Sequence, residues 1–377
     1  RCAAFCFVQF VASVHIFTHH LWQQTKYLAH WRYRAWGVSW VACFFVLSGF
    51  KLTYSQLRRK DPRELEPFVP YMWRRLARLY PIYYLSLLMT LILSLVRGER
   101  LPTWIVLPFN ITLTFTWIGS VAGGWHAGWH GTHWYMGDLI FHQIVWRWVF
   151  PVVNRLTAPV LCVVLVCCLA LTAARCTCIQ LAYCEQEVTY WPGYTFHVFL
   201  SGMCIAKLCV LRSESPRGAA GDPLALPLGG RRVPLSGLAS FVLILLAFQV
   251  HPEWVAANAK NCTWTGLLLP LHLLLVWCLC LEEGPLDWLC QRRPFTWMGE
   301  LSYGVYILHW NALMLTRCYG HVYFPDAWSA HFRFWCFILP ATVLFSAFAM
   351  VCVDRPAQAW ASSFLRRAIA PPKPHEK

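Results

Sequence analysis

The stretch "RRLARLYPIYYLSLL", Arg74 to Leu88, places three arginines directly before an apolar and aromatic run that can enter a membrane. Charged side chains at such a boundary are costly unless they bind a partner or reach lipid headgroups. Arg75 and Arg78 are three residues apart, and Arg74 and Arg78 are four apart. One helical face can therefore carry all three guanidinium groups. Pro81 is expected to end this short interfacial helix and to begin a second, membrane-crossing one.

Apolar runs of similar length recur along the whole chain of 377 residues, which is 58% hydrophobic and only 13% charged. Soluble domains carry about 25% charged residues. The sequence therefore predicts an all-α, multi-pass integral membrane protein, a polytopic helical bundle of about ten transmembrane helices. The expected crossings are 3–21, 36–54, 79–96, 104–121, 156–174, 196–211, 234–251, 264–281, 298–318 and 333–353.

The stretch 134–153 is aromatic but interrupted by polar and charged residues, and the basic loops decide whether it crosses. If it does not cross, the arginine-rich segments 55–78, 212–232 and 282–297 and the C-terminal tail all lie in the cytoplasm, as the positive-inside tendency requires. We therefore expect ten crossings with both ends cytoplasmic. The stretch 134–153 is then a re-entrant or interfacial segment that lines a protein cavity.

The remaining composition argues for one membrane domain over 1–360, followed by a disordered cytoplasmic tail over 361–377. The net charge of +15 comes from basic residues in short loops, which favours membrane topology over nucleic-acid binding. Most of the 18 cysteines lie inside apolar runs, where they act as small buried hydrophobes.

Two interpretations of the arginine group stay open. Guanidinium groups bind phosphate in bidentate fashion, so Arg74, Arg75 and Arg78 could hold a phosphorylated cofactor that enters from the cytoplasm. Coenzyme A fits this interpretation through its pyrophosphate and 3′-phosphate groups. Alternatively, the three arginines are positive-inside anchors that reach lipid headgroups.

Five motifs follow one another along the chain: "FFVLSGF" (Phe44–Phe50), "RRLARLYPIYYL" (Arg74–Leu85), "THWYMGDLIFHQI" (Thr132–Ile144), "WMGELSYGVYILHW" (Trp297–Trp310) and "VDRPAQ" (Val353–Gln358). Together they resemble the acyltransferase-three family of integral membrane proteins, over about residues 1–360. The "WYMGD" stretch is similar to the eukaryotic branch, which includes nose-resistant-to-fluoxetine-like proteins. The resemblance implies about ten transmembrane helices and O-acylation, usually acetylation, of a hydroxyl acceptor such as a carbohydrate or lipid. It also implies that Arg75 and Arg78 are the family's paired cytoplasmic arginines and that the donor is acyl-CoA.

Transfer to a hydroxyl needs a base, and histidine suits this role because its unperturbed pKa lies near neutrality. His15 lies inside the first apolar run, His19 shares its face, and His20 points elsewhere. The family has a functional histidine eleven residues after an arginine, but no histidine stands eleven after Arg1, so both His15 and His19 remain candidates. Asp138 is expected to orient the base, unless it caps a helix or forms an ion pair with Arg147 in a loop.

Further histidines and hydroxyls could line the substrate pocket. Three histidines of "GWHAGWHGTHW" have metal-ligand spacing if helical: His126, His130 and His133. The glycines between them favour a loop, so no metal is expected and His133 is assigned to the pocket wall. In "SYGVYILHW", Ser302, Tyr306 and His309 form a polar stripe that either packs the bundle or contacts the substrate.

The leading hypothesis is thus a membrane-bound O-acyltransferase with acyl-CoA, a hydroxyl-bearing acceptor and the bilayer as partners. A transporter of a lipid or organic anion is the alternative, because buried arginine and histidine side chains also serve transport. Many transporters show internal repeats, and none is recognisable in this sequence. A catalytically silent relative that acts as a scaffold or receptor is the third possibility.

Overall fold

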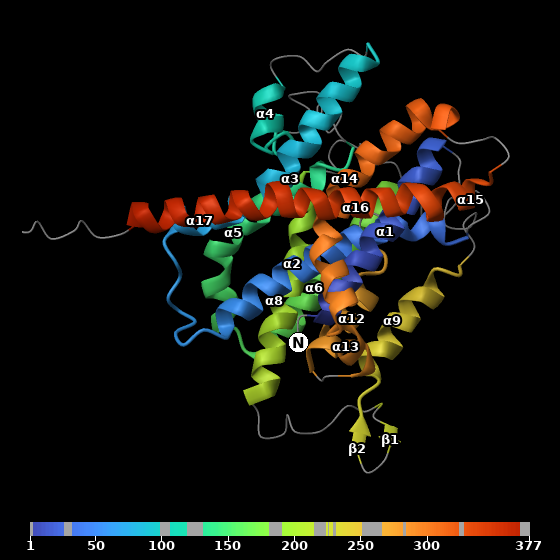
Figure 1. Cartoon of the computed structure of the whole chain (residues 1–377). Helices are drawn as coiled ribbons and strands as arrows, with labels where there is room; N and C mark the ends of the chain where they lie inside the picture. Colours follow the sequence, from blue (N-terminus) through green and yellow to red (C-terminus); the bar gives the residue numbers. More distant parts are fainter. Residues whose placement is uncertain are drawn as a thin grey trace, which may run out of the picture.

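The computed structural model describes residues 3–25, 32–98, 106–118, 131–180, 191–214, 224, 226–228, 231–250, 266–281, 284–323 and 328–369. Most of these residues form helices joined by turns and loops, and a hairpin of two three-residue strands lies outside the bundle (Figure 1). The elements are α1 (Ala3–Thr25), η1 (Arg32–Ser39), α2 (Trp40–Leu57), α3 (Phe68–Val96), α4 (Leu107–Ile111), α5 (Trp134–Arg155), α6 (Ala158–Gln180), α8 (Pro192–Glu214), β1 (Leu226–Leu228), β2 (Arg231–Val233), α9 (Ser236–Ala247), α12 (Leu269–Leu281), α13 (Pro285–Cys290), α14 (Arg293–Tyr323), α15 (Ala330–Arg333), η5 (Phe334–Ile338), α16 (Leu339–Ala349), η6 (Met350–Asp354) and α17 (Arg355–Ile369).

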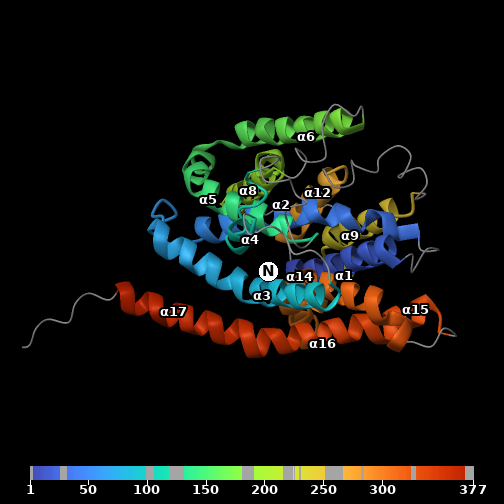
Figure 2. The same cartoon turned by 90° about the horizontal axis from the view of Figure 1, so that it is seen from above.

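The bundle has two groups of packed helices. In one group α2 packs against α8, α5 and α12, with α6 outside α8. In the other, α14 packs against α1, α3 and α16, and Figure 2 shows the C-terminal helix along the side opposite α6. Large apolar side chains fill the interior, whereas α6 and α16 expose theirs, as lipid-facing helices do.

The chain is an integral, multi-pass membrane protein, as the sequence predicts. In the described part of the chain, six helices are long and apolar enough to cross a membrane, and α9 and α12 are shorter apolar helices. Helices α5 and α14, with 22 and 31 residues, are long enough but more polar. The expectation of an all-α bundle with about ten transmembrane helices is consistent with this set.

The segment 104–121 is not the membrane-crossing helix that the sequence predicts. Its described part contains only the five residues of α4, followed by turns up to residue 118. Short polar side chains bond to the main chain here: Asn110 donates to the Val106 carbonyl at 3.0 Å, and Thr112 to the Pro108 carbonyl at 2.8 Å. Such local bonds compete with a continuing helix.

The stretch 134–153, expected to be a re-entrant or interfacial segment that lines a cavity, belongs to the continuous 22-residue helix α5, so it contains no re-entrant turn. Trp146 and Arg147 of this helix do line a cavity. At 1.5 Å per residue this helix is about 33 Å long, which matches a bilayer core. Its polar residues Asp138, His142 and Gln143 are buried in the bundle, so they lower the hydropathy without facing lipid. If α5 replaces 104–121 as the fourth crossing, the arginine-rich loops keep their expected cytoplasmic side.

Two further boundaries differ from expectation. Pro81 was expected to separate two helices, but helix α3 runs unbroken through it. A membrane helix can contain a proline because neighbouring helices and small changes in helix geometry compensate for the main-chain hydrogen bond that proline cannot make. Residues 361–369 continue helix α17 rather than starting a disordered tail, because α17 packs against α3. Trp73 of α3 donates to the Ala361 carbonyl at 2.9 Å. Residues 370–377 lie outside the described residues.

Two glycines let α2 and α8 approach closely. A Cβ atom added to Gly49 would lie 2.1 Å from the Phe199 carbonyl oxygen, and one added to Gly202 would lie 2.0 Å from the Val46 carbonyl oxygen. Both obstacles are main-chain atoms, so the helices would have to separate. Small residues commonly permit such close contacts between membrane helices.

We expect Gly49→Ala or Gly202→Ala to lower the free energy of unfolding by about 1–3 kcal/mol, the usual cost of overpacking. Thermal unfolding of the detergent-solubilised protein measures the effect. Gly304→Ala is the control, since its Cβ would meet the Ser346 side chain at 3.1 Å, a milder conflict. A destabilisation by Gly304→Ala equal to that of the other two would contradict the close crossing of α2 and α8.

Candidate functional site

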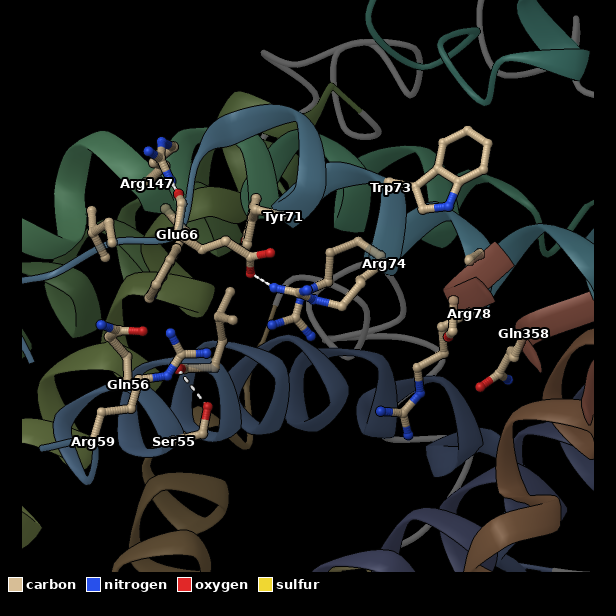
Figure 3. Close-up of a pocket in the computed structure, with 16 residues that line it drawn as sticks. Ser55, Gln56, Arg59, Glu66, Tyr71, Trp73, Arg74, Arg78, Arg147 and Gln358 are labelled. Carbon is tan, nitrogen blue, oxygen red and sulfur yellow. Dashed lines mark hydrogen bonds and ion pairs between the residues drawn. The ribbon is translucent and has the colours of Figure 1, made fainter. Parts of the chain in front are cut away.

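An arginine-lined cavity of about 280 Å³ lies at the expected cytoplasmic end of the bundle (Figure 3). Its walls come from the end of α2 and the loop after it, the first turns of α3, the middle of α5, and α17. Five arginines from three separate parts of the chain line it: Arg59, Arg74, Arg75, Arg78 and Arg147. The structure thus brings the three arginines predicted from sequence together and adds two that the sequence argument missed.

Two aromatic side chains and a main-chain carbonyl hold Arg75 in place. The Arg75 guanidinium lies 5.3 Å from the ring centre of Tyr71, and the Tyr71 hydroxyl donates to the Gln143 carbonyl at 2.9 Å. Trp146 of α5 stacks on the same tyrosine ring at 5.7 Å. Because the Tyr71 ring is held by these contacts, it positions the Arg75 guanidinium group through a cation–π contact.

The cavity is strongly electropositive. Among the described residues that line it, Glu66 is the acidic side chain facing five arginines. Asp354 interacts electrostatically with Arg78 but does not line the cavity, and its carboxylate accepts from Gln358 at 2.8 Å. Guanidinium groups arranged in this way suit an anion with several phosphate groups.

The two first-helix histidines predicted as the base lie on one face of α1, but this face packs against η1. A Cβ atom added to Gly37 of η1 would lie 2.5 Å from the His15 carbonyl oxygen and 2.6 Å from the His19 Cβ. The Trp40 indole donates to His15 Nδ1 at 3.0 Å. Because an indole N–H can only donate, Nδ1 of a neutral His15 accepts this hydrogen bond with its lone pair, and the ring proton is on Nε2.

His20 is the α1 histidine that meets α14, although the sequence argument set it aside. Its ring stacks on His309 with centroids 5.4 Å apart and planes 19° apart. His309 is fully buried, and its Nδ1 lies 2.5 Å from the Tyr306 carbonyl oxygen. Since a carbonyl only accepts, Nδ1 carries the proton, and the neutral ring has its lone pair on Nε2.

A buried polar group continues from these histidines toward α3. The Ser86 hydroxyl donates to Asn311 Oδ1 at 2.7 Å and lies 3.3 Å from His133 Nε2. The Asn311 amide donates in turn to the Ser86 carbonyl at 3.1 Å and to the Thr90 hydroxyl at 3.0 Å. His133 therefore sits beside the α3–α14 contact, and its assignment to a pocket wall stays a prediction.

Asp138 is not placed to orient a first-helix histidine. The carboxylate is fully buried and accepts from the Thr195 hydroxyl on α8 at 2.9 Å, and that hydroxyl lies 3.1 Å from His142 Nε2. Helix α5 packs against α8, which draws Asp138 toward this threonine. The spacing of Asp138 and His142, four apart on one helix, is the sequence signal that could have indicated this pair. Arg147, the alternative partner considered for Asp138, donates instead to the Glu66 carbonyl.

The other predicted residues of the polar stripe, Ser302 and Tyr306, make contacts inside the bundle. The Ser302 hydroxyl donates to the Gly299 carbonyl at 2.8 Å within its own helix, and its carbonyl accepts from Ser13 at 3.0 Å, so it packs α1 against α14. Tyr306 contacts both Thr132 and His309: its hydroxyl lies 3.4 Å from the Thr132 carbonyl oxygen, and its ring centre lies 5.9 Å from that of His309. The other two histidines of the metal alternative, His126 and His130, lie outside the described residues.

Arg78 and Ser86 are eight residues apart on α3, about 12 Å along the helix axis. No histidine lines the arginine cavity in the described part of the chain, so the cavity ends before the histidine group. Tyr303 of α14 lies between the two regions, where its hydroxyl donates to the Leu79 carbonyl at 2.5 Å. The α3–α14 contact thus separates an electropositive cavity from a buried histidine group.

A multi-pass membrane bundle with an arginine-lined cavity at one end defines the general class of this protein. Residues 1–352 match the acyltransferase-3 family model, which is described as an acyltransferase domain. Because the match covers most of the chain, the chain belongs to the acyltransferase-3 family and is a membrane-embedded acyltransferase. Comparison with curated proteins and with solved structures gives no match.

Proposed function

We propose that this acyltransferase binds acyl-CoA in the arginine-lined cavity and transfers the acyl group to a hydroxyl acceptor within the bundle. The observation that carries the proposal is the convergence of five arginines from three segments on one cavity. Positive-inside anchors need only reach the headgroups, whereas Arg75 is turned inward onto Tyr71. The phosphate groups of coenzyme A supply the anionic charge that such a cavity can bind.

His309 is our candidate for the base, in preference to His15 and His19. A general base needs a lone pair directed at the acceptor and a second nitrogen held by an acceptor group. His309 has this arrangement because its Nδ1–H is fixed by the Tyr306 carbonyl, whereas the Nδ1 lone pair of His15 is used by Trp40. His20, stacked on His309, helps to fix the plane of the ring.

The transfer step follows from these roles. The acceptor hydroxyl oxygen attacks the thioester carbonyl carbon while His309 Nε2 takes the hydroxyl proton. The carbon–sulfur bond then breaks, the coenzyme leaves as a thiolate, and the imidazolium returns the proton to give the free thiol. The products are the acylated acceptor and coenzyme A. In this scheme Tyr306 and His133 line the acceptor side. The α3–α14 contact at Tyr303, which closes the cavity in the empty protein, opens when the donor binds and lets the acyl arm reach His309.

The finer assignments are part of the same proposal. The family assignment supports an acetyl group as the transferred acyl and a carbohydrate or lipid hydroxyl as the acceptor. The motif "WYMGD" supports membership of the eukaryotic, nose-resistant-to-fluoxetine-like branch. Asp138 acts in this scheme through Thr195 and His142, as a residue that fixes α5 against α8.

The proposal is tested with purified protein in nanodiscs and acetyl-CoA labelled in the acetyl group. We expect release of free coenzyme A that depends on an added hydroxyl acceptor, together with label in the acylated product. Flux of an organic anion or lipid across proteoliposomes without any use of acetyl-CoA would replace the proposal by the transporter alternative.

A further inference from the structure

Glu66 occupies the arginine cavity in a way that the anion-binding role does not require. Its carboxylate forms an ion pair with Arg74, and Figure 3 shows both side chains directed toward each other at the cavity wall. The Glu66 side chain is only 16% exposed, whereas that of Arg74 is 51% exposed. The acid is therefore enclosed by the cavity rather than displayed at the protein surface.

The loop that carries Glu66 is held at several points. The Gln56 amide donates to the carbonyls of Pro62 and Glu64, each at 3.0 Å. Arg147 of α5 donates to the carbonyl of Glu66 itself. These bonds go to main-chain atoms, so they fix the loop while leaving the Glu66 carboxylate able to rotate away from Arg74.

We infer that Glu66 is an internal competitor of the donor: its carboxylate occupies Arg74 in the empty cavity and is displaced by a phosphate group when acyl-CoA binds. This inference rests on the proposed function and adds a residue that sets donor affinity. A carboxylate and a phosphate use the same bidentate geometry on a guanidinium group, so the two cannot occupy Arg74 fully at the same time.

The arrangement has a physical advantage for the empty protein. Five guanidinium groups around one cavity repel each other, and one enclosed carboxylate reduces that repulsion until a ligand arrives. The same carboxylate weakens binding of every anion that needs Arg74. Glu66 therefore lowers donor affinity, and its removal tightens binding.

The test measures binding of labelled coenzyme A to the full chain in nanodiscs. We expect Glu66→Gln to tighten binding about threefold to tenfold, the range for removing one competing, partly exposed ion pair. Glu64→Gln is the matched control, because it removes the same charge from an exposed residue of the same loop that does not line the cavity. In an Arg74→Gln background, Glu66→Gln is expected to have no further effect.

The outcomes separate this inference from the proposed function. If the wild type binds coenzyme A but Glu66→Gln leaves binding unchanged or weaker, or if the tightening persists without Arg74, the inference about Glu66 is wrong and the donor site stands. If the wild type binds no coenzyme A, both fail. Should Glu66→Gln not fold, Arg74→Gln alone decides: we expect it to cost less affinity than Arg78→Gln, and an equal or larger cost overturns the inference.

Discussion

Replacing His309 by asparagine is expected to lower kcat by about 10²-fold to 10⁴-fold, the usual contribution of a general base. The asparagine amide can still donate to the Tyr306 carbonyl, as Nδ1 of the histidine does, so the local packing is retained while the basic Nε2 is lost. The KM for acyl-CoA is expected to change by less than about twofold, because an interaction made in the chemical step affects kcat rather than donor binding. Steady-state release of coenzyme A at saturating acceptor measures both constants.

The matched control is His272→Asn. His272 is also fully buried, but it lies on α12 and stacks on Trp40, with ring centres 5.5 Å apart, rather than on α14. We expect this control to retain most of its activity once unfolding temperatures have been compared. A His309→Asn variant that keeps more than about a third of wild-type kcat would remove His309 as the base. Loss of activity in His15→Asn or His19→Asn instead would restore the assignment made from sequence.

The second large effect concerns the donor site. We expect the double variant Arg75→Gln/Arg78→Gln to raise the KM for acyl-CoA at least about 100-fold, because each charge-assisted hydrogen bond to a phosphate contributes about 1.5–3 kcal/mol. At saturating donor, kcat should change little, since neither side chain contacts the reacting atoms in the proposed scheme. The KM of the wild type should also rise with salt more steeply than that of the variant, because fewer guanidinium groups remain to be screened.

A control of equal charge is Arg155→Gln/Arg292→Gln, since both residues lie at the expected cytoplasmic ends of helices and neither lines the cavity. This variant should leave the KM within about twofold of wild type if specific contacts, rather than net charge, bind the donor. Equal behaviour of the two double variants would support the other interpretation of the arginines, as anchors at the lipid headgroups.

The local part of the candidate site could be predicted from sequence because it depends on spacing along one helix. Arg74, Arg75 and Arg78 share a cavity because residues three and four apart lie on one face of α3. Arg59 and Arg147 could not be added in this way, since they lie in the loop after α2 and on α5, outside the helix that carries the other three arginines. The same limit applies to the histidines. A sequence shows that a histidine lies inside a crossing, but the partner of each ring nitrogen depends on the neighbouring helix.

Hydropathy alone did not predict the structure of two segments, 104–121 and α5. Averaged hydropathy marks α5 as polar because it counts Asp138, His142 and Gln143 as though they faced lipid, whereas all three are buried in the bundle. It treats 104–121 as apolar enough, because it cannot register the bonds that Asn110 and Thr112 make to the main chain. The charges of the loops remain consistent with the expected topology if α5 crosses in place of 104–121, since that exchange leaves the later loops on the same side.

By itself, the sequence determined the class of this protein, its helical bundle and the arginine face of α3, because hydrophobic length and helical spacing are properties of contiguous residues. The tertiary structure alone decided that His20, rather than His15, meets α14, that Asp138 belongs with Thr195, and that Glu66 faces Arg74. The physical reason is that these contacts depend on how each helix is rotated against its neighbours. That rotation is set by packing, such as the close approach of α2 and α8 at Gly49 and Gly202.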